Sequence, residues 1–237
     1  MRNIIITTIF IVNAYISFGQ TSDVVSTKKI SLGVIFSPDY CYRSLNSETS
    51  NQWIVDSRDS IEIPKYGFTT GLSLLLEPWN RISFETGLHY SNKGEKTKTI
   101  ELYPAEPGPA LPTNRIRFIY HYYYLDIPIK VNYIVLKGKV KIFVSAGFST
   151  NIYLYQRTKV IFDGSDETSS SSSSGELSRL NFAVLIGGGI DYIINNRLNF
   201  KLEPIFRRSI TPIVDAPIKQ YQYSIGANFG LYYKLNK

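Results

Sequence analysis

Three side chains on one short segment are of the types that acid–base and nucleophilic chemistry needs. Glu85, His89 and Ser91 supply a carboxylate, an imidazole and a hydroxyl. Such groups cooperate when hydrogen bonds of about 2.6–3.2 Å join them. All three have the same parity in a segment where polar and apolar residues alternate. On one face of a strand the nearest neighbours are already roughly 7 Å apart, so this spacing alone does not assemble a triad.

Charged residues of both signs occupy the middle of several such segments, on the polar side of the alternation. A buried charge is costly unless an opposite charge or hydrogen bonds accompany it, so in a narrow interior these residues are expected to pair. We interpret them as a structural charge network and not as a catalytic site. The network comprises Glu85, Asp126, Lys130, Lys141, Asp191, Lys201, Glu203 and Arg207.

The composition excludes several other classes of site. Two histidines and one cysteine are too few for a structural zinc site or a disulfide scaffold. Lys and Arg number 26 against 19 Asp and Glu, but they are scattered and form no dense run. This pattern argues against a nucleic-acid partner. The sequence therefore predicts no catalytic, cofactor-binding or metal-binding residue.

The first 19 residues are typical of a secretory signal. Arg2 gives a positive start, residues 4–16 are largely apolar, and Ser17 and Gly19 place small residues before the predicted cleavage at Gln20. The apolar stretch is shorter than the roughly 20 residues of a membrane-spanning helix. No cysteine follows it to carry a lipoprotein anchor. We predict a cleaved signal peptide over 1–19 and an exported domain over 20–237.

The rest of the chain alternates apolar and polar residues in segment after segment, which is the period of a β-strand. In 221–235 every odd position is apolar or aromatic, whereas nearly all even positions are small or polar. The pattern predicts eight strands, most of them longer than the 5–6 residues usual in soluble proteins. Their ranges are 29–43, 68–77, 81–91, 118–135, 140–155, 180–193, 197–206 and 221–235.

Short and long connections alternate between these strands. The turns at 77–80, 136–139 and 195–196 contain the Asn or Gly residues of tight hairpins, whereas 45–66, 94–117, 156–179 and 211–219 are long. The serine run 169–174 in the third long connection is expected to be a flexible loop. Because the strand pattern resumes unchanged after every connection, we expect one domain.

An even number of long antiparallel strands, with short turns at one end and long loops at the other, is the plan of an outer-membrane barrel. Aromatic residues near strand ends fit its interfacial girdles, and a polar face rich in Gly, Ser and Asn fits a narrow lumen. The tyrosines assigned to girdles are Tyr40, Tyr42, Tyr120, Tyr122, Tyr123, Tyr124, Tyr153, Tyr155, Tyr221, Tyr223, Tyr232 and Tyr233.

We therefore predict an all-β fold: an eight-stranded antiparallel up-and-down transmembrane β-barrel with long exterior loops and short periplasmic turns. Eight strands enclose only enough space for side chains, so an open pore is not expected. The alternative is a soluble lipocalin-like barrel with its apolar face inside. His121 is expected on the lipid-facing side near a girdle. Cys41 is expected to be a packed free thiol, with an intermolecular disulfide as the alternative.

The segment from Tyr123 to Tyr133, YYLDIPIKVNY, resembles the "YLEIPxxxKY" strand of the PorT-like outer-membrane β-barrel family of Bacteroidota. VSAGF at 144–148 is similar to the "xxAGP" strand of that family, and 224–234 is similar to its closing strand. Asp126 stands in place of Glu, Phe148 in place of Pro, and the chain ends in LNK, not in an aromatic residue. The resemblance covers essentially all of 20–237 and implies an eight-stranded outer-membrane barrel. Pro128 is expected at a bulge or an unpaired position, because proline cannot donate to the ladder.

The namesake of that family is needed for protein export through the type IX secretion system. We accordingly expect a non-enzymatic outer-membrane protein that acts through its exterior loops, as a secretion accessory or as a surface interaction protein. Its expected partners are outer-membrane lipid and secretion-system or cell-surface proteins, and the oligomeric state is left open. The alternatives are a lipid A-modifying enzyme that uses Glu85, His89 and Ser91, or a soluble ligand-binding barrel.

Overall fold

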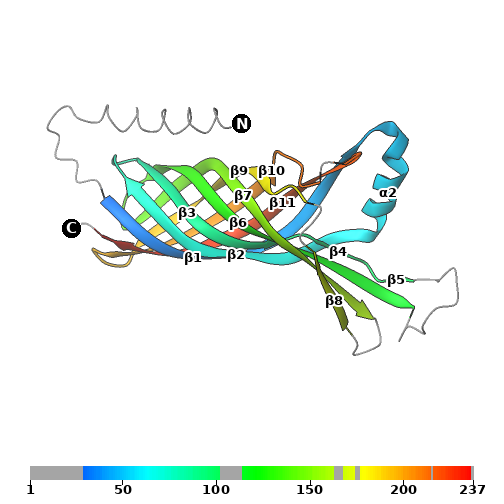
Figure 1. Cartoon of the computed structure of the whole chain (residues 1–237). Coiled ribbons are helices and arrows are strands. Elements are labelled where there is room, and N and C mark those ends of the chain that lie inside the picture. The colour runs from blue at the N-terminus through cyan, green and yellow to red at the C-terminus, as the bar shows by residue number, and fades with distance from the viewer. Residues whose placement is uncertain (1–28, 102–113, 163–167, 174–176, 215, 236–237) are drawn as a thin grey trace.

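Eight long antiparallel strands close into a ring in the computed structural model, which describes residues 29–101, 114–162, 168–173, 177–214 and 216–235 (Figure 1). Each ring strand pairs with its neighbours along the chain, and the first pairs with the last to close the ring. The predicted eight-stranded barrel is confirmed, whereas the predicted signal peptide lies outside the described residues. The ring strands are β1 (Lys29–Ser47), β2 (Glu62–Glu77), β3 (Ile82–Lys93), β6 (Arg115–Leu136), β7 (Val140–Phe162), β9 (Leu180–Ile193), β10 (Leu198–Ser209) and β11 (Ile218–Lys234).

The apolar side of each strand faces outward. On β1, Leu32, Val34 and Phe36 are 46%, 58% and 52% exposed, whereas Ser31 before them and Ser37 after them are almost fully buried. A lipocalin-like barrel would bury the apolar set and expose the serines. This alternative is therefore wrong, and the outer face has the apolar surface that lipid requires. No helix among the described residues is long and apolar enough to cross a membrane.

Not every predicted girdle tyrosine lies in a girdle. Tyr122, Tyr124, Tyr153 and Tyr232 point inward and are at most 8% exposed. In a run of consecutive tyrosines on one strand, each residue faces the side of the sheet opposite to that of the residue before it. Tyr123 accordingly faces outward, where its ring stacks 4.4 Å from that of Tyr155 and 5.7 Å from that of Tyr90, centroid to centroid. These three rings mark the exterior girdle.

Prolines in the ring strands lie where pairing is interrupted. The pairing of β3 with β6 runs from Thr86–Ile129 to His89–Asp126 and skips Pro128. Pro38 is skipped between β1 and β11, and Pro204 between β9 and β10. On the side where pairing is skipped, the neighbouring strand accepts no backbone hydrogen bond from the proline, which has no N–H to donate. The predicted unpaired position of Pro128 is confirmed.

The segments predicted as loops contain regular structure. They hold the 3-10 turn η1 (Thr49–Asn51), α2 (Gln52–Ile61), β4 (Glu95–Thr97), β5 (Ile100–Glu101) and β8 (Thr168–Ser173). The flexible loop predicted for the serine run is wrong over Thr168–Ser173, which pairs antiparallel with Gln156–Ile161 of β7. Backbone hydrogen bonds to an existing strand do not depend on the side chain, so a weak strand-forming sequence is ordered by its neighbour.

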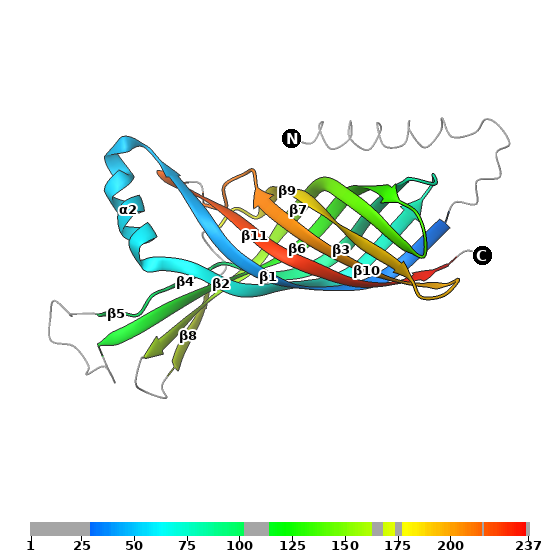
Figure 2. The same cartoon turned by 180° about the vertical axis from the view of Figure 1, so that it is seen from behind.

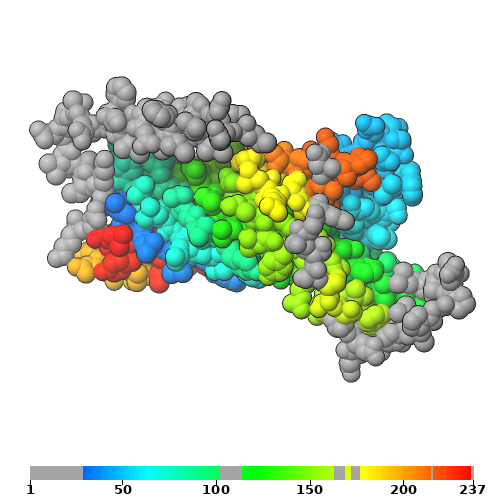
Figure 3. All heavy atoms as spheres, in the orientation of Figure 1, coloured from blue at the N-terminus to red at the C-terminus, as the bar shows by residue number. Residues whose placement is uncertain are grey.

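The long strands diverge in two directions beyond the girdle (Figures 1 and 2), and β4 joins the two parts by pairing with both β2 and β6. On one side β1, β2 and β11 rise toward α2. On the other side lies the exterior arm, which we define as β4, β5, β8 and residues 115–122 of β6 and 156–162 of β7. The arm leans away from the barrel axis, and the space-filling view shows its base adjoining the α2 side of the molecule (Figure 3). Lys98, the residue after β4, donates its N–H to Ile61 O at the end of α2 over 2.7 Å. The described ends of the chain meet at the opposite, short-turn end, where Leu235 N donates to Ile30 O over 2.8 Å.

Candidate functional site

Two lysines and two glutamates form the centre of the lumen. Lys130 Nζ lies 2.9 Å from Glu85 Oε1 and 2.7 Å from Glu203 Oε2, while Lys201 is paired with the second oxygen of Glu85. All four side chains are at most 5% exposed. The cluster carries equal numbers of positive and negative charges, which is the condition for burying them at tolerable cost.

Neutral donors complete the coordination of the two carboxylates. The Tyr232 hydroxyl donates to Glu85 over 3.2 Å, and Ser145 Oγ and Asn228 Nδ2 donate to Glu203 over 2.6 and 2.8 Å. These donors come from β7 and β11, so the central cluster connects strands on several sides of the ring. A carboxylate with this many partners is held in place and has little freedom for proton transfer.

Further ion pairs lie on both sides of this centre. Toward the exterior, Arg207 pairs with Asp39 at 2.6 Å and Lys93 with Asp126 at 2.9 Å. Toward the short turns, Lys141 lies 3.1 Å from Glu77 and 3.4 Å from Asp191. All eight residues of the predicted charge network therefore lie in lumenal ion pairs.

Three members of these pairs were missed by sequence reasoning. Asp39 lies opposite the apolar set of the first predicted strand, and its parity alone would have identified it as lumenal. Lys93 and Glu77 lie at or beyond the ends of predicted strands, where parity could not be assigned.

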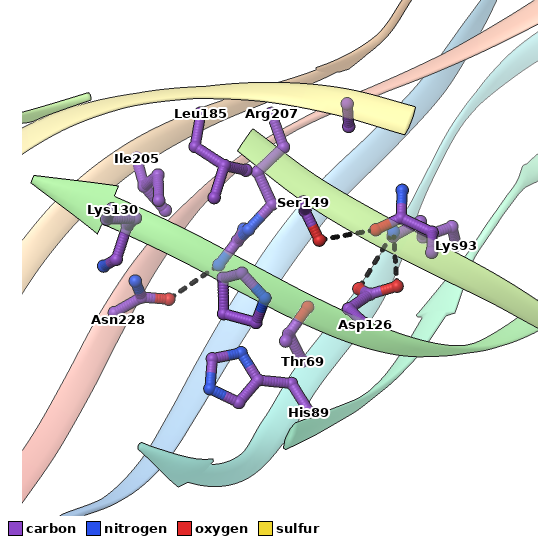
Figure 4. Close-up of a pocket in the computed structure, with 13 residues that line it drawn as sticks. Thr69, His89, Lys93, Asp126, Lys130, Ser149, Leu185, Ile205, Arg207 and Asn228 are labelled. Atoms are coloured by element: carbon purple, nitrogen blue, oxygen red, sulfur yellow. Dashed lines mark hydrogen bonds and ion pairs between the residues drawn. The ribbon is translucent and has the colours of Figure 1, made fainter. Parts of the chain in front are cut away.

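Small cavities lie between the side chains of the described part of the lumen. Two cavities of about 20 Å³ each lie within it, one lined by His89, Asp126 and Arg207 among others (Figure 4) and one beside Lys141 and Lys201. A cavity of this size holds about one water molecule. In the described part of the chain, the barrel is thus filled by its own side chains.

The acid–base–hydroxyl trio is not brought together. Both Glu85 oxygens are engaged by lysines, and the buried Ser91 Oγ has no hydrogen-bond partner among the described residues. His89 Nε2 instead lies 2.9 Å from Ser73 Oγ on the neighbouring strand. This Ser–His pair was not predicted, because it depends on the register of β2 against β3. Among the described residues, no carboxylate is hydrogen bonded to the other ring nitrogen of His89.

A second polar cluster lies outside the girdle, between β2, β4 and α2. Glu62 accepts hydrogen bonds from Arg43 Nε and Arg58 Nε, each over 2.7 Å, and Arg43 also pairs with Asp59. Glu95 is 1% exposed, and its Oε1 accepts from Tyr122 over 3.0 Å and from Gln220 over 3.2 Å. Burial, reinforced by the negative charge of Glu62, raises the pKa of Glu95 from 4.5 to about 7.

A third group of polar side chains lies near the exterior girdle, around Lys65. Lys65 Nζ lies 2.5 Å from Asn92 Oδ1 and 3.1 Å from His121 Nδ1. His121 stacks on Tyr123 on the outward side, as expected for a residue near a girdle.

Cys41 is 1% exposed, with its Sγ 3.9 Å from Asn92 O, which fits the packed thiol and not an intermolecular disulfide. No group of three or more His, Cys, Asp or Glu side chains suited to a metal occurs among the described residues.

The sequence matches a family model over residues 18–215: the outer membrane protein beta-barrel domain. The chain belongs to this family. It is accordingly an outer-membrane protein, and the predicted localisation is confirmed. No curated protein matches the sequence.

Several solved outer-membrane barrels are similar in structure. Neisserial surface protein A has 13% identity and a TM-score of 0.43, with 85% of this chain and 96% of that chain covered. OprG from Pseudomonas aeruginosa has 11% identity and a TM-score of 0.45, with 89% and 96% covered. The outer membrane protease OmpT from Escherichia coli has 9% identity and a TM-score of 0.40, with 91% and 99% covered. At these scores the likeness says nothing of function.

Proposed function

We propose that this outer-membrane barrel is a non-enzymatic surface interaction protein that binds a protein partner with the structured region outside the exterior girdle. The observation that carries the proposal is a contrast along the barrel axis. The lumen is filled by paired charges, while α2 and the arm extend the strands well beyond the membrane. Because loops and exterior elements of a barrel commonly carry its function, the ordered structure outside the girdle supports a role in recognition.

Exposed aromatic residues on the exterior supply anchors for such a contact. Trp53 on α2 is 70% exposed, and Tyr66, which packs against Tyr40 at the outer edge of the girdle, is 79% exposed. Large aromatic side chains dominate binding energy where a partner covers them. Since Trp53 lies well outside the girdle, lipid burial does not account for its exposure.

Within this role, an accessory function in type IX secretion is the specific candidate. It is supported by the resemblance of the segment Tyr123–Tyr133 to the PorT-like strand. The aromatic half of this segment contributes to the girdle through Tyr123 and to the lumen through Tyr124. Both tyrosines have structural roles. A protein partner would therefore be bound by the exterior elements and not by the segment Tyr123–Tyr133.

Lipid A modification is disfavoured by the site geometry. His89 is 7% exposed, its hydroxyl partner Ser73 is 1% exposed, and the adjoining cavity holds about one water molecule. A glycolipid substrate needs an opening from the lipid or the exterior to the reacting groups.

The interaction is tested by photo-crosslinking in living cells. A benzoylphenylalanine residue replaces Trp53 in one variant and Trp79, the 61% exposed tryptophan of a short periplasmic turn, in the control. A discrete protein adduct is expected from position 53 and not from position 79. Absence of an adduct at 53, or equal adducts at both positions, would refute binding through the exterior.

The secretion role is tested separately on a deletion strain. Its secreted proteins and lipid A are compared with those of strains complemented by the wild type or by His89→Ala. Selective loss of exported proteins, restored by both genes, supports the secretion role. An unchanged secretome rejects that role, and a lipid A change that only the wild type restores would establish the enzyme instead.

A further inference from the structure

Cations gather on the outward face of the exterior arm. Paired residues on neighbouring strands share one face of a sheet. Ile119 pairs with Lys96 on one side and with Lys159 on the other, and His121 pairs with Arg157. Arg117 has the same parity as Ile119 and His121 on β6 and therefore faces the same way. Lys96, Arg117, Arg157 and Lys159 thus form one basic face.

This basic face directly continues the exterior girdle. Tyr123 pairs with Tyr155 in the ring, and His121 and Arg157 are the next outward-facing pair along β6 and β7. Tyr90 completes the girdle, with its hydroxyl 3.0 Å from that of Tyr155. Aromatic girdles lie at the depth of lipid headgroups, so the cations begin at the headgroup level and extend outward from it.

The hydrogen-bond partners of this face are neutral in the part of the chain that the structure describes. Among the described residues, none of the four is in an ion pair. Arg157 Nη2 donates to Ser170 Oγ over 3.3 Å, and Arg117 Nη2 donates to Thr99 Oγ1 over 3.1 Å. These neutral hydroxyls orient the guanidinium groups and leave their charge available. Arg115, which lies opposite Glu101 on β5, is not counted as part of the face.

The ionisation of His121 reflects the same concentration of positive charge. Burial, together with the positive charges of Lys65, Arg157 and Lys159, lowers the pKa of His121 from 6.5 to about 4. His121 therefore adds no charge at neutral pH, and the site keeps four fixed cations.

The orientation of the arm favours lipid over a dissolved polyanion. The arm leans away from the barrel axis (Figures 1 and 2), so its outward face is the one nearer the membrane surface. Arginine and lysine bind phosphate through charge-assisted hydrogen bonds, and basic patches at a membrane boundary recognise anionic headgroups. We propose that Lys96, Arg117, Arg157 and Lys159 form a binding face for phosphate groups of outer-leaflet lipids. This proposal is independent of the protein partner proposed above.

The test measures lipid binding to the purified full chain in neutral detergent by native mass spectrometry. Phosphatidic acid and phosphatidylcholine with identical acyl chains are the probes. Arg157→Gln combined with Lys159→Gln is compared with Arg208→Gln combined with Lys219→Gln. The control pair removes two exposed, outward-facing cations at the exterior end of β10 and β11. Heat-dependent gel mobility verifies that each variant is folded.

Phosphatidic acid is expected to bind the wild type and the control pair, with about 30-fold weaker binding to the Arg157 and Lys159 variant for two lost headgroup contacts. Arg157→Lys combined with Lys159→Arg keeps the charge and should retain binding. Equal losses in both pairs, or equal binding of phosphatidylcholine, would overturn the proposal. So would complete displacement of phosphatidic acid by equimolar inorganic phosphate, because the site would then recognise a free anion.

Discussion

The lumen and the exterior arm use the same strands and the same charged residue types in opposite ways. Lys130 on β6 has two carboxylates within 2.9 Å and is 2% exposed. Lys159 on β7 has no ion pair among the described residues. Inside the ring, a lysine without a partner would bear a large desolvation cost, whereas outside it water supplies the solvation. Charge is therefore structural inside the barrel and available for binding outside it.

Hydrogen bonding shows the same contrast. The carboxylates and ammonium groups of the central cluster all have partners. Toward the exterior, Arg43 Nη2, Glu95 Oε2 and Gln222 Nε2 are buried without a hydrogen-bond partner among the described residues. Buried polar atoms without protein partners are where bound water is expected. Ser91 Oγ and Asn199 Oδ1 in the lumen are also buried without a partner among the described residues, so the contrast is between the central cluster and the cluster around Glu95.

The largest expected effect comes from breaking the central cluster. Lys130→Met leaves Glu203 without its direct ion pair and should destabilise the folded barrel by about 3–5 kcal/mol. The urea midpoint of folding in lipid vesicles, read by heat-dependent gel mobility, measures the loss. Adding Glu203→Gln should recover part of the stability. A midpoint within error of the wild type would mean that the cluster does not hold the ring together.

Overpacking of the lumen should have a smaller effect. A Cβ atom at Gly33 would lie 2.6 Å from the ring of Tyr232, which must then move away from Glu85. Gly33→Ala is expected to cost about 1–3 kcal/mol in the same urea assay. The control is Gly138→Ala in a short turn, where the nearest atom lies at an ordinary 3.4 Å. Equal midpoints for the two variants would contradict the filled lumen.

In the exterior half, stability should depend on pH through Glu95. Its folded-state pKa is raised from 4.5 to about 7, so the folded arm favours the protonated form. The stabilisation is fully present below about pH 4.5 and is lost as pH rises through about 7. Hydrogen exchange of the β4 amides, corrected for intrinsic rates, should show about 70-fold more opening at pH 8 than at pH 5. Glu95→Gln should remove this difference, and persistence of it in the variant would assign the titration elsewhere.

The smallest effect is expected from the exterior counterpart of Lys130. Lys159→Met should change the urea midpoint by no more than about 0.5 kcal/mol, because the side chain has no ion pair to lose among the described residues. A loss of stability near that of Lys130→Met would contradict the proposal that charges inside the barrel are structural and charges outside it are free to bind ligands.

The sequence by itself determined the period-two pattern, the number of ring strands and the side of each strand that faces lipid. These follow from local chemistry, because a strand must place alternate residues on opposite faces. Parity likewise predicted that Glu85, Lys130 and Glu203 lie inside. It did not reveal that Asp39 is the partner of Arg207, 168 residues away along the chain.

Only the tertiary structure decided which charges meet, where Ser73 stands relative to His89, and that the segments beyond the girdle form α2 and an arm. Pairing across the lumen depends on strand register and barrel closure. Both depend on several strands together, so they cannot be predicted from the sequence of a single segment. The strand formed by Thr168–Ser173 depends likewise on the β7 edge beside it. The basic face depends on both the sequence and the tertiary structure. The odd or even position of each cation along its strand determines that it faces outward, and the strand register determines that the cations lie side by side.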